Sequence, residues 1–146
     1  MELIVRIKKR LHQFTLNADI ETKSSIALLG ASGSGKSMTL KCIAGIEKPD
    51  SGVIILNGRT LYDSEKGIDL PPQKRKIGYL FQNYALFPNM TVRQNIEVAA
   101  KEKNNVDKLI SDFYLNSIAN KYPDEISGGQ QQRTALARII ASKPEA

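Results

Sequence analysis

The sequence predicts an α/β fold with an antiparallel β layer at the N-terminus and a block of helices toward the C-terminus. Three observations support this class. Two early segments, 3–7 and 14–20, are typical of strands, and the second alternates between apolar and polar residues as half-buried strands do. An apolar run, a glycine-rich turn and a helical pattern then follow one another between residues 25 and 45. Capping-box patterns open helices after residues 91 and 127, and the 41% hydrophobic content of the 146 residues suffices for a core.

The strands of the β layer are predicted from short apolar or alternating runs. We expect them at residues 3–7, 14–20, 53–56 and 59–62, with His12 and Gln13 in the first turn or at the start of the second strand. Asn57-Gly58 between apolar segments is a strong hairpin signal, because both residues tolerate positive φ. The N-terminal layer should therefore consist of two hairpins.

Two further apolar segments, 25–29 and 77–81, are predicted as short buried strands, the first of parallel type. Residues 63–76 are polar and contain Pro71-Pro72, so we expect a surface loop there. Its basic cluster, Lys74-Arg75-Lys76, is interpreted as solvated, as is Lys8-Lys9-Arg10.

Four helices follow from apolar spacing and end signals. The first covers Met38–Ala44 and stops at Gly45, a typical residue after a helix C-terminus. Thr91 and Gln94 form a capping box that starts a helix reaching about Ala100. An amphipathic stretch predicts a helix at 106–115, and a second capping box, Ser127 with Gln130, starts a helix to about residue 142.

The composition restricts partners and location. The net charge is +6, but the basic residues are spread out, so no nucleic-acid partner is expected. A single cysteine, Cys42, excludes an internal disulfide and any CxxC metal site, and its place on a helix predicts a buried thiol. With no signal-peptide layout and no membrane-spanning apolar run, we expect a cytoplasmic chain that is soluble by itself.

Residues 30–37 read Gly-Ala-Ser-Gly-Ser-Gly-Lys-Ser and fit the phosphate-binding pattern G-x-x-x-x-G-K-[ST]. Glycines let the backbone N–H groups face an anion at the positive end of the following helix. Lys36 would reach the β- and γ-phosphates, the Ser37 hydroxyl would bind Mg²⁺, and the Met38 N–H could bind the α-phosphate. The alternative is a glycine-rich hairpin with an incidental lysine. The residues expected to hold the nucleotide are Gly30, Ala31, Ser32, Gly33, Ser34, Gly35, Lys36, Ser37 and Met38.

Two more motifs carry a family resemblance. Ser127-Gly128-Gly129-Gln130, preceded by Ile126, resembles the signature sequence Leu-Ser-Gly-Gly-Gln of ABC-type ATPases, and Gln82 stands where that family has its Q-loop glutamine. The chain is thereby identified as a member of the family of ATP-binding subunits of ABC transporters. Residues 56–96 resemble most the ATPase of molybdate importers, although sulfate, polyamine and sugar importer subunits share this frame.

The resemblance implies a P-loop NTPase fold of the ABC ATPase type, with ATP and Mg²⁺ as ligands. It makes Lys36 and Gln82 catalytic, and Ser37 and Gln82 ligands of the metal. Ser127, Gly128, Gly129 and Gln130 would contact the ATP held by the opposite subunit of a head-to-tail homodimer. From the residues alone, the same segment is equally a simple helix cap.

The resemblance also implies partners and parts. A membrane permease would dock near Leu86, Phe87 and Pro88, for which ordinary core packing is the alternative, and a periplasmic or surface solute-binding protein would act indirectly. The subunit would lie peripherally at the cytoplasmic face of the membrane. The expected parts are a nucleotide-binding core with the β layer at 1–81, a Q-loop and helical subdomain at 82–126, and the signature with its helix at 127–146.

Two departures from the family pattern matter. No residue clearly matches the aromatic that stacks on adenine, since Phe14 lies nearer the phosphate loop than expected and His12 is ambiguous. The sequence also stops at Ala146, before the Walker B Asp-Glu pair, so we expect an incomplete domain that binds Mg-ATP weakly and has negligible ATPase activity. A non-hydrolysing regulatory module is one alternative. DNA-repair and chromosome-maintenance ATPases are disfavoured, because no heptad insertion or zinc cysteines occur.

Overall fold

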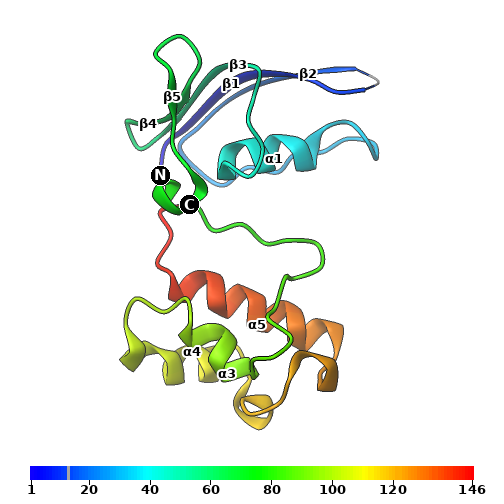
Figure 1. Ribbon diagram of the computed structural model, residues 1–146, viewed down its shortest axis with the longest axis vertical. Helices are drawn as coiled ribbons and strands as arrows, with labels where there is room; N and C mark the ends of the chain where they lie inside the picture. The colour runs from blue at the N-terminus through cyan, green and yellow to red at the C-terminus, as the bar shows by residue number, and fades with distance from the viewer. Residues whose placement is uncertain (13) are drawn as a thin grey trace. The chain divides into compact units, whose positions relative to one another are not determined.

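The computed structural model describes residues 1–12 and 14–146 (Figure 1). It divides into two compact units, each considered by itself: Met1–Ile77 with Ala146, and Gly78–Glu145. His12 lies in a bend after the first strand, while the expectation for Gln13 falls outside the described residues.

The first unit contains a five-stranded antiparallel sheet with the strand order β2-β1-β3-β4-β5. The strands are β1 (Leu3–Arg10), β2 (Thr15–Thr22), β3 (Ser51–Leu56), β4 (Arg59–Asp63) and β5 (Ile68–Asp69). In the register, Val5 lies opposite both Ile20 and Ile54. All four predicted strands of the β layer are confirmed, with ends that differ from the predicted ones by at most three residues.

The Asn57-Gly58 hairpin is confirmed by its backbone angles. Asn57 has φ +50° and Gly58 has φ +76°, as the tight turn between twisted strands requires. Asn57 also ties the turn to the N-terminus, because its N–H donates to the Glu2 carbonyl at 2.8 Å and its side-chain oxygen accepts from the Glu2 N–H at 2.8 Å.

Helix α1 (Lys36–Ala44) lies along one face of this sheet (Figure 1). Cys42 and Ile43 face the strands, whereas Leu40 is 47% exposed. Gly45 follows the helix with φ +80°, so the predicted stop is confirmed. The core of this unit consists of Leu3, Val5, Ile7, Ala18, Cys42, Ile43, Ile54, Leu56, Leu61 and Tyr62.

The predicted strands at 25–29 and 77–81 are wrong. Neither segment belongs to any sheet of the described residues, and the sheet that does form is antiparallel throughout. Ile26 is 44% exposed and Leu29 is 92% exposed, while Phe81 is 38% exposed. A strand needs hydrogen-bonded neighbours, and apolar side chains alone do not supply them.

Residues 63–76 are more ordered than the predicted surface loop. They contain β5 and a short helix, α2 (Pro72–Arg75). Arg75 is only 1% exposed, so the interpretation of its basic cluster as solvated is wrong for this residue. The reason is that its guanidinium bonds to carbonyl groups at the end of α1.

The second unit is helical. It comprises α3 (Val92–Glu97), α4 (Val106–Asp112) and α5 (Gly128–Ala141), with the short 3₁₀ turns η1 (Lys103–Asn105), η2 (Asn116–Ile118) and η3 (Pro123–Glu125). Both predicted capping boxes are present, at Thr91 and at Ser127. Its core consists of Val92, Ile96, Val106, Leu109, Ile110, Leu115, Ile118, Ala119, Ile126, Ala137 and Ala141.

Two of these helices end earlier than predicted. After α3, the Ala99 and Ala100 N–H groups bond three residues back instead of four, which tightens the chain into a turn. After α4, Tyr114 takes φ +55°, and the Leu115 N–H donates to the Ile110 carbonyl at 2.8 Å. This is the hydrogen bond of a left-handed helix end. None of the helices among the described residues could cross a membrane.

Candidate functional site

The glycine-rich loop at 30–37 leads directly into α1. Gly30, Gly33 and Gly35 all have positive φ, at +154°, +82° and +93°. At Gly35, which precedes the helix, a Cβ would lie 2.8 Å from the Leu16 Cδ1 atom. A side chain at this position would therefore be strained and would also collide with β2.

The Lys36 ammonium folds back over this loop. Its Nζ donates to the Gly30 carbonyl at 2.7 Å, to the Ala31 carbonyl at 2.6 Å and to the Ser34 hydroxyl at 3.3 Å. All three donors thus point into the loop. Ionised phosphate oxygens are stronger acceptors than these neutral groups, so an entering phosphate could replace them.

The backbone N–H groups of Lys36, Ser37 and Met38 lie in the first turn of α1, where a helix has no internal acceptors. Together with the helix dipole they favour an anion. The Ser37 hydroxyl is on an exposed residue of the same turn. No cluster of three acidic, histidine or cysteine residues that could hold a metal occurs among residues 1–12 and 14–146. Mg²⁺ held by the Ser37 hydroxyl would need further oxygen ligands, such as phosphate oxygens or water.

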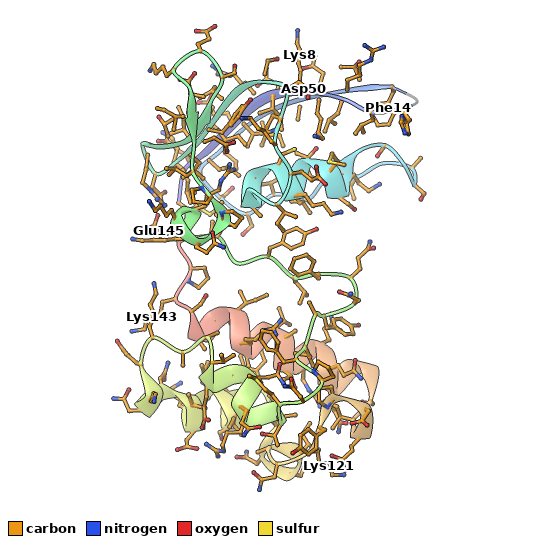
Figure 2. The ribbon with its side chains drawn as sticks, in the orientation of Figure 1. Lys8, Phe14, Asp50, Lys121, Lys143 and Glu145 are labelled. Atoms are coloured by element: carbon orange, nitrogen blue, oxygen red, sulfur yellow. The ribbon has the colours of Figure 1, made fainter. Side chains whose placement is uncertain are left out.

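Phe14 lies against the phosphate loop. Its Cζ and Cε2 atoms are 3.5 and 3.6 Å from the position that a Cβ of Gly35 would take, and its side chain is 39% exposed. Figure 2 labels this ring, beside the loop that leads into α1. Phe14 is therefore an aromatic residue that lies beside the loop with part of its ring exposed.

Gln82 is an exposed residue at the start of a turn in the second unit. The Tyr84 N–H donates to the Phe81 carbonyl at 2.9 Å, and the Ala85 N–H donates to the Asn83 carbonyl at 2.7 Å. Tyr84 and Ala85 have φ +60° and +45°, unusual values for residues with a Cβ. Gln82 is thus followed directly by a strained turn.

The segment after this turn lies at the surface. Phe87 is 44% exposed and Pro88 is exposed, so neither belongs to the buried core. One residue further on begins a groove of about 630 Å³. The residues that line it are Asn89, Met90, Gln94, Glu97, Val98 and Lys103. Apolar and charged groups therefore meet in a concave surface next to Phe87.

Ser127 forms a reciprocal cap at the start of α5. Its hydroxyl accepts from the Gln130 N–H at 3.3 Å, and its N–H donates to the Gln130 Oε1 at 2.9 Å. The space beside the Cα atoms of Gly128 and Gly129 is open, so a ligand could approach the backbone there. The cap exists as the residues alone suggested, and the helix N-terminus beside it also suits an anion.

Three residues that were not predicted as site residues hold α1 and the segment after Gln82 in place. Arg75 bonds to the end of α1, the helix that follows the phosphate loop. Asn95 and Arg138 bond to the segment after Gln82. Asn95 lies between Val92 and Ile96 on a buried helix face, and a polar residue in that position is a signal that could have indicated it.

In a comparison with known protein families, the model of the family described as ABC transporter matches residues 14–146 of this chain. The sulfate/thiosulfate import ATP-binding protein CysA of Synechocystis is 42% identical over 98% of this chain and 42% of that protein. The molybdenum import ATP-binding protein ModC of Paramagnetospirillum magneticum is 37% identical over 94% of this chain and 40% of that protein. The chain thus spans about two fifths of the length of these relatives.

Solved structures agree with this result. The dimeric, post-hydrolysis form of the ATP-binding cassette MJ0796, bound to ADP and phosphate, matches with a TM-score of 0.75 at 24% identity over 99% of this chain and 71% of that one. A second dimeric structure of MJ0796, described as a bacterial ABC transporter cassette, gives 0.72 at 25% identity over the same shares. The predicted ABC ATPase fold is confirmed.

Proposed function

The chain belongs to the ABC transporter family, and we propose that it is the ATP-binding part of an ABC importer subunit. The observation that carries this proposal is the loop at 30–37, where three glycines with positive φ lead into the first turn of α1 and the Lys36 ammonium folds back onto the Gly30 and Ala31 carbonyls. The importer relatives, which are 42% and 37% identical to this chain over the aligned residues, support it.

In the proposed mechanism Lys36 exchanges its carbonyl partners for the β- and γ-phosphate oxygens of ATP. The N–H groups of Lys36 and Ser37 donate to the same phosphates, the Met38 N–H donates to the α-phosphate, and Phe14 offers its ring face to the base. Bound Mg²⁺ would neutralise charge on the phosphates, with the Ser37 hydroxyl and Gln82 as its protein ligands. These contacts position and polarise ATP, which is what phosphoryl transfer chiefly requires.

A second copy of the subunit would complete the site. Ser127, Gly128, Gly129 and Gln130 form a helix N-terminus suited to the γ-phosphate of ATP held by the partner, in a head-to-tail homodimer. Support comes from the two cassette structures, which are described as dimeric. In this proposal, the part at 1–81 holds ATP and the part at 82–126 couples the subunit to the membrane permease. The part at 127–146 contacts the ATP held by the partner.

The proposed cargo is molybdate or a related oxyanion such as sulfate, because relatives named for both are similarly close. The permease would dock at Leu86, Phe87, Pro88 and the neighbouring groove, at the cytoplasmic face of the membrane. An exposed aromatic ring next to a concave surface suits an inserted helix. Replacing Phe87 by aspartate should abolish co-purification with the permease, and unchanged co-purification would refute this site.

We also propose that the 146-residue chain alone hydrolyses ATP slowly. The Lys36 ammonium bonds to two loop carbonyls and the Ser34 hydroxyl, whereas phosphoryl transfer also needs groups that position the metal and the attacking water. A non-hydrolysing regulatory role is the second candidate that this observation favours.

Affinity and turnover measured side by side test both statements. Calorimetry should show Mg-ATP binding that Lys36→Ala weakens at least tenfold, because an ammonium–phosphate contact is lost. Lys41→Ala, on the same helix, should leave the affinity unchanged. Phosphate release should stay near background. Equal affinity of the wild-type and Lys36→Ala chains would refute the binding site, and Lys36-dependent turnover would refute slow hydrolysis.

A further inference from the structure

The turn after Gln82 holds two successive residues, Tyr84 and Ala85, in the left-handed region of φ. A Cβ makes this conformation unfavourable, and glycine is the residue that normally adopts it. The hydrogen bonds within the turn, from Tyr84 to Phe81 and from Ala85 to Asn83, join near neighbours only. Something else in the unit must therefore hold the turn in this shape.

Arg138, from the last third of α5, makes the contacts that can do so. Its Nη2 donates to the Tyr84 carbonyl at 3.1 Å and its Nη1 donates to the Ala85 carbonyl at 2.8 Å. One planar guanidinium thus donates a hydrogen bond to the carbonyl of each strained residue. It also lies 5.4 Å from the centre of the Phe87 ring, within cation–π range.

Asn95 of α3 holds the same segment from within the core. It is fully buried, and its Oδ1 accepts from the Phe87 N–H at 2.8 Å. Its Nδ2 donates to the Phe87 and Met90 carbonyls at 3.1 and 3.0 Å. The Arg138 Nη1 lies 3.5 Å from the Asn95 Oδ1, which connects the two anchors.

The positively charged guanidinium of Arg138 makes its contacts with this segment. Burial lowers the pKa of its guanidinium, but arginine stays protonated, so the charge must be stabilised locally. Within the described part of the chain, no ion pair to a carboxylate is found for Arg138; its partners are carbonyl and amide oxygens and an aromatic ring. This distinguishes it from Arg133, an exposed residue of the same helix.

We propose that Arg138 is a positioning residue that locks the left-handed turn at Tyr84 and Ala85, so that the segment from Tyr84 to Met90 opens and closes together with α5. Since Ser127 caps the N-terminus of α5, this lock would join the signature segment to the exposed Phe87. That consequence for transport rests on the proposed function, whereas the lock itself does not.

Hydrogen exchange of single amides at increasing urea, without nucleotide or partner, tests the lock. In the wild-type chain the Phe87 amide should share its urea dependence with buried amides of α5 such as Ala135, because the two open as one cooperative unit. In Arg138→Ala the Phe87 amide should exchange about ten- to a hundredfold faster and lose its urea dependence, since bonds from a charged donor are lost. The Ala135 amide should keep its dependence.

Three further variants sharpen the test. Arg133→Ala, the matched control, should change neither amide. Arg138→Lys should give a partial effect, because one ammonium cannot copy the two-pronged contact. Adding Ala85→Gly to Arg138→Ala should slow Phe87 exchange again by about fivefold, as the strain that needed the lock is removed.

Parallel acceleration of Phe87 and Ala135 with equal urea dependence would show that Arg138 contributes only general stability, and would overturn the proposal. So would an unchanged Phe87 amide, or the absence of rescue by Ala85→Gly. If Arg138→Ala does not fold, the same comparison is made with Arg138→Lys. Failure of ATP binding or permease docking would leave these exchange results intact, so the two proposals fail separately.

Discussion

Replacing Arg75 by alanine should destabilise the first unit strongly. The Arg75 side chain is 1% exposed and makes four hydrogen bonds. Its Nη1 donates to the Cys42 and Ile43 carbonyls at 2.7 and 3.0 Å, and its Nε donates to the Leu70 carbonyl at 2.7 Å. Its Nη2 reaches the Asp69 Oδ1 at 3.1 Å.

The size of the effect follows from these partners. Cys42 and Ile43 carry two of the last carbonyls of α1, where a positive charge is favoured by the helix dipole and unmade bonds are costly. The pair with Asp69 counts for less, because the Asp69 side chain is 38% exposed. Bonds from a charged donor contribute about 1.5–3 kcal/mol each and are not additive, so we expect a loss of about 3 kcal/mol.

Urea unfolding followed by far-ultraviolet circular dichroism measures this loss. Lys74→Ala, at the exposed neighbouring position, is the control and should change the free energy of unfolding by less than about 0.5 kcal/mol. Arg75→Lys should lose an intermediate amount of stability, since lysine keeps the positive charge but lacks the planar, multiply donating guanidinium. A loss below about 1 kcal/mol in Arg75→Ala would refute the assigned role.

Gly45 provides an internal check on this reasoning. A Cβ at Gly45 would lie 2.5 Å from the Arg75 Nε, and the φ of +80° adds strain. Gly45→Ala should therefore cost more in the wild-type chain than in Arg75→Ala, where the colliding group is gone. Equal costs in the two backgrounds would show that the guanidinium does not occupy this space.

Three other predictions concern separate regions. Phe14→Ala should weaken ATP binding about tenfold by calorimetry through lost base stacking, while Phe14→Trp should retain it; equal binding of all three would exclude stacking. Tyr114→Gly should stabilise the chain by about 1 kcal/mol in urea unfolding, because Tyr114 is 80% exposed at φ +55°, whereas Tyr114→Ala should not. Burial raises the pKa of the Cys42 thiol and of the Tyr62 hydroxyl, which also donates to the Pro49 carbonyl at 2.8 Å. The unfolded chain therefore releases these protons at lower pH than the folded chain, so stability should hold below about pH 8.5 and fall as the pH rises toward the raised pKa values. Cys42→Ala should flatten the part of the fall that begins near pH 8.5, and an unchanged curve would contradict the thiol's part in it.

Local signals predicted the fold where the structure depends on nearby residues. The Asn57-Gly58 turn, the stop at Gly45 and the capping boxes at Thr91 and Ser127 were all predictable, because each rests on bonds spanning a few residues. The same holds for the phosphate loop, whose pattern encodes its own backbone angles and the helix that follows.

Contacts between residues far apart in the sequence could not be predicted from local signals. Residues 25–29 and 77–81 have apolar composition, yet a strand also needs a neighbour, which composition does not reveal. Arg75 stood in a basic cluster that resembled a solvated surface, and its burial depends on carbonyls more than 30 residues away. Arg138 likewise reaches Ala85 across 53 residues.

The most direct test of ATP binding at residues 30–37 is a titration with Mg-ATP that is monitored through amide and side-chain NMR shifts. If this loop binds the phosphates, the Lys36 ammonium should leave the Gly30 and Ala31 carbonyls. The largest shifts should then occur at the backbone N–H groups of Gly33, Gly35, Lys36, Ser37 and Met38. Lys36→Ala should suppress these shifts, whereas Lys41→Ala should not. Shifts that lie outside this loop, or that persist in Lys36→Ala, would contradict ATP binding at this loop.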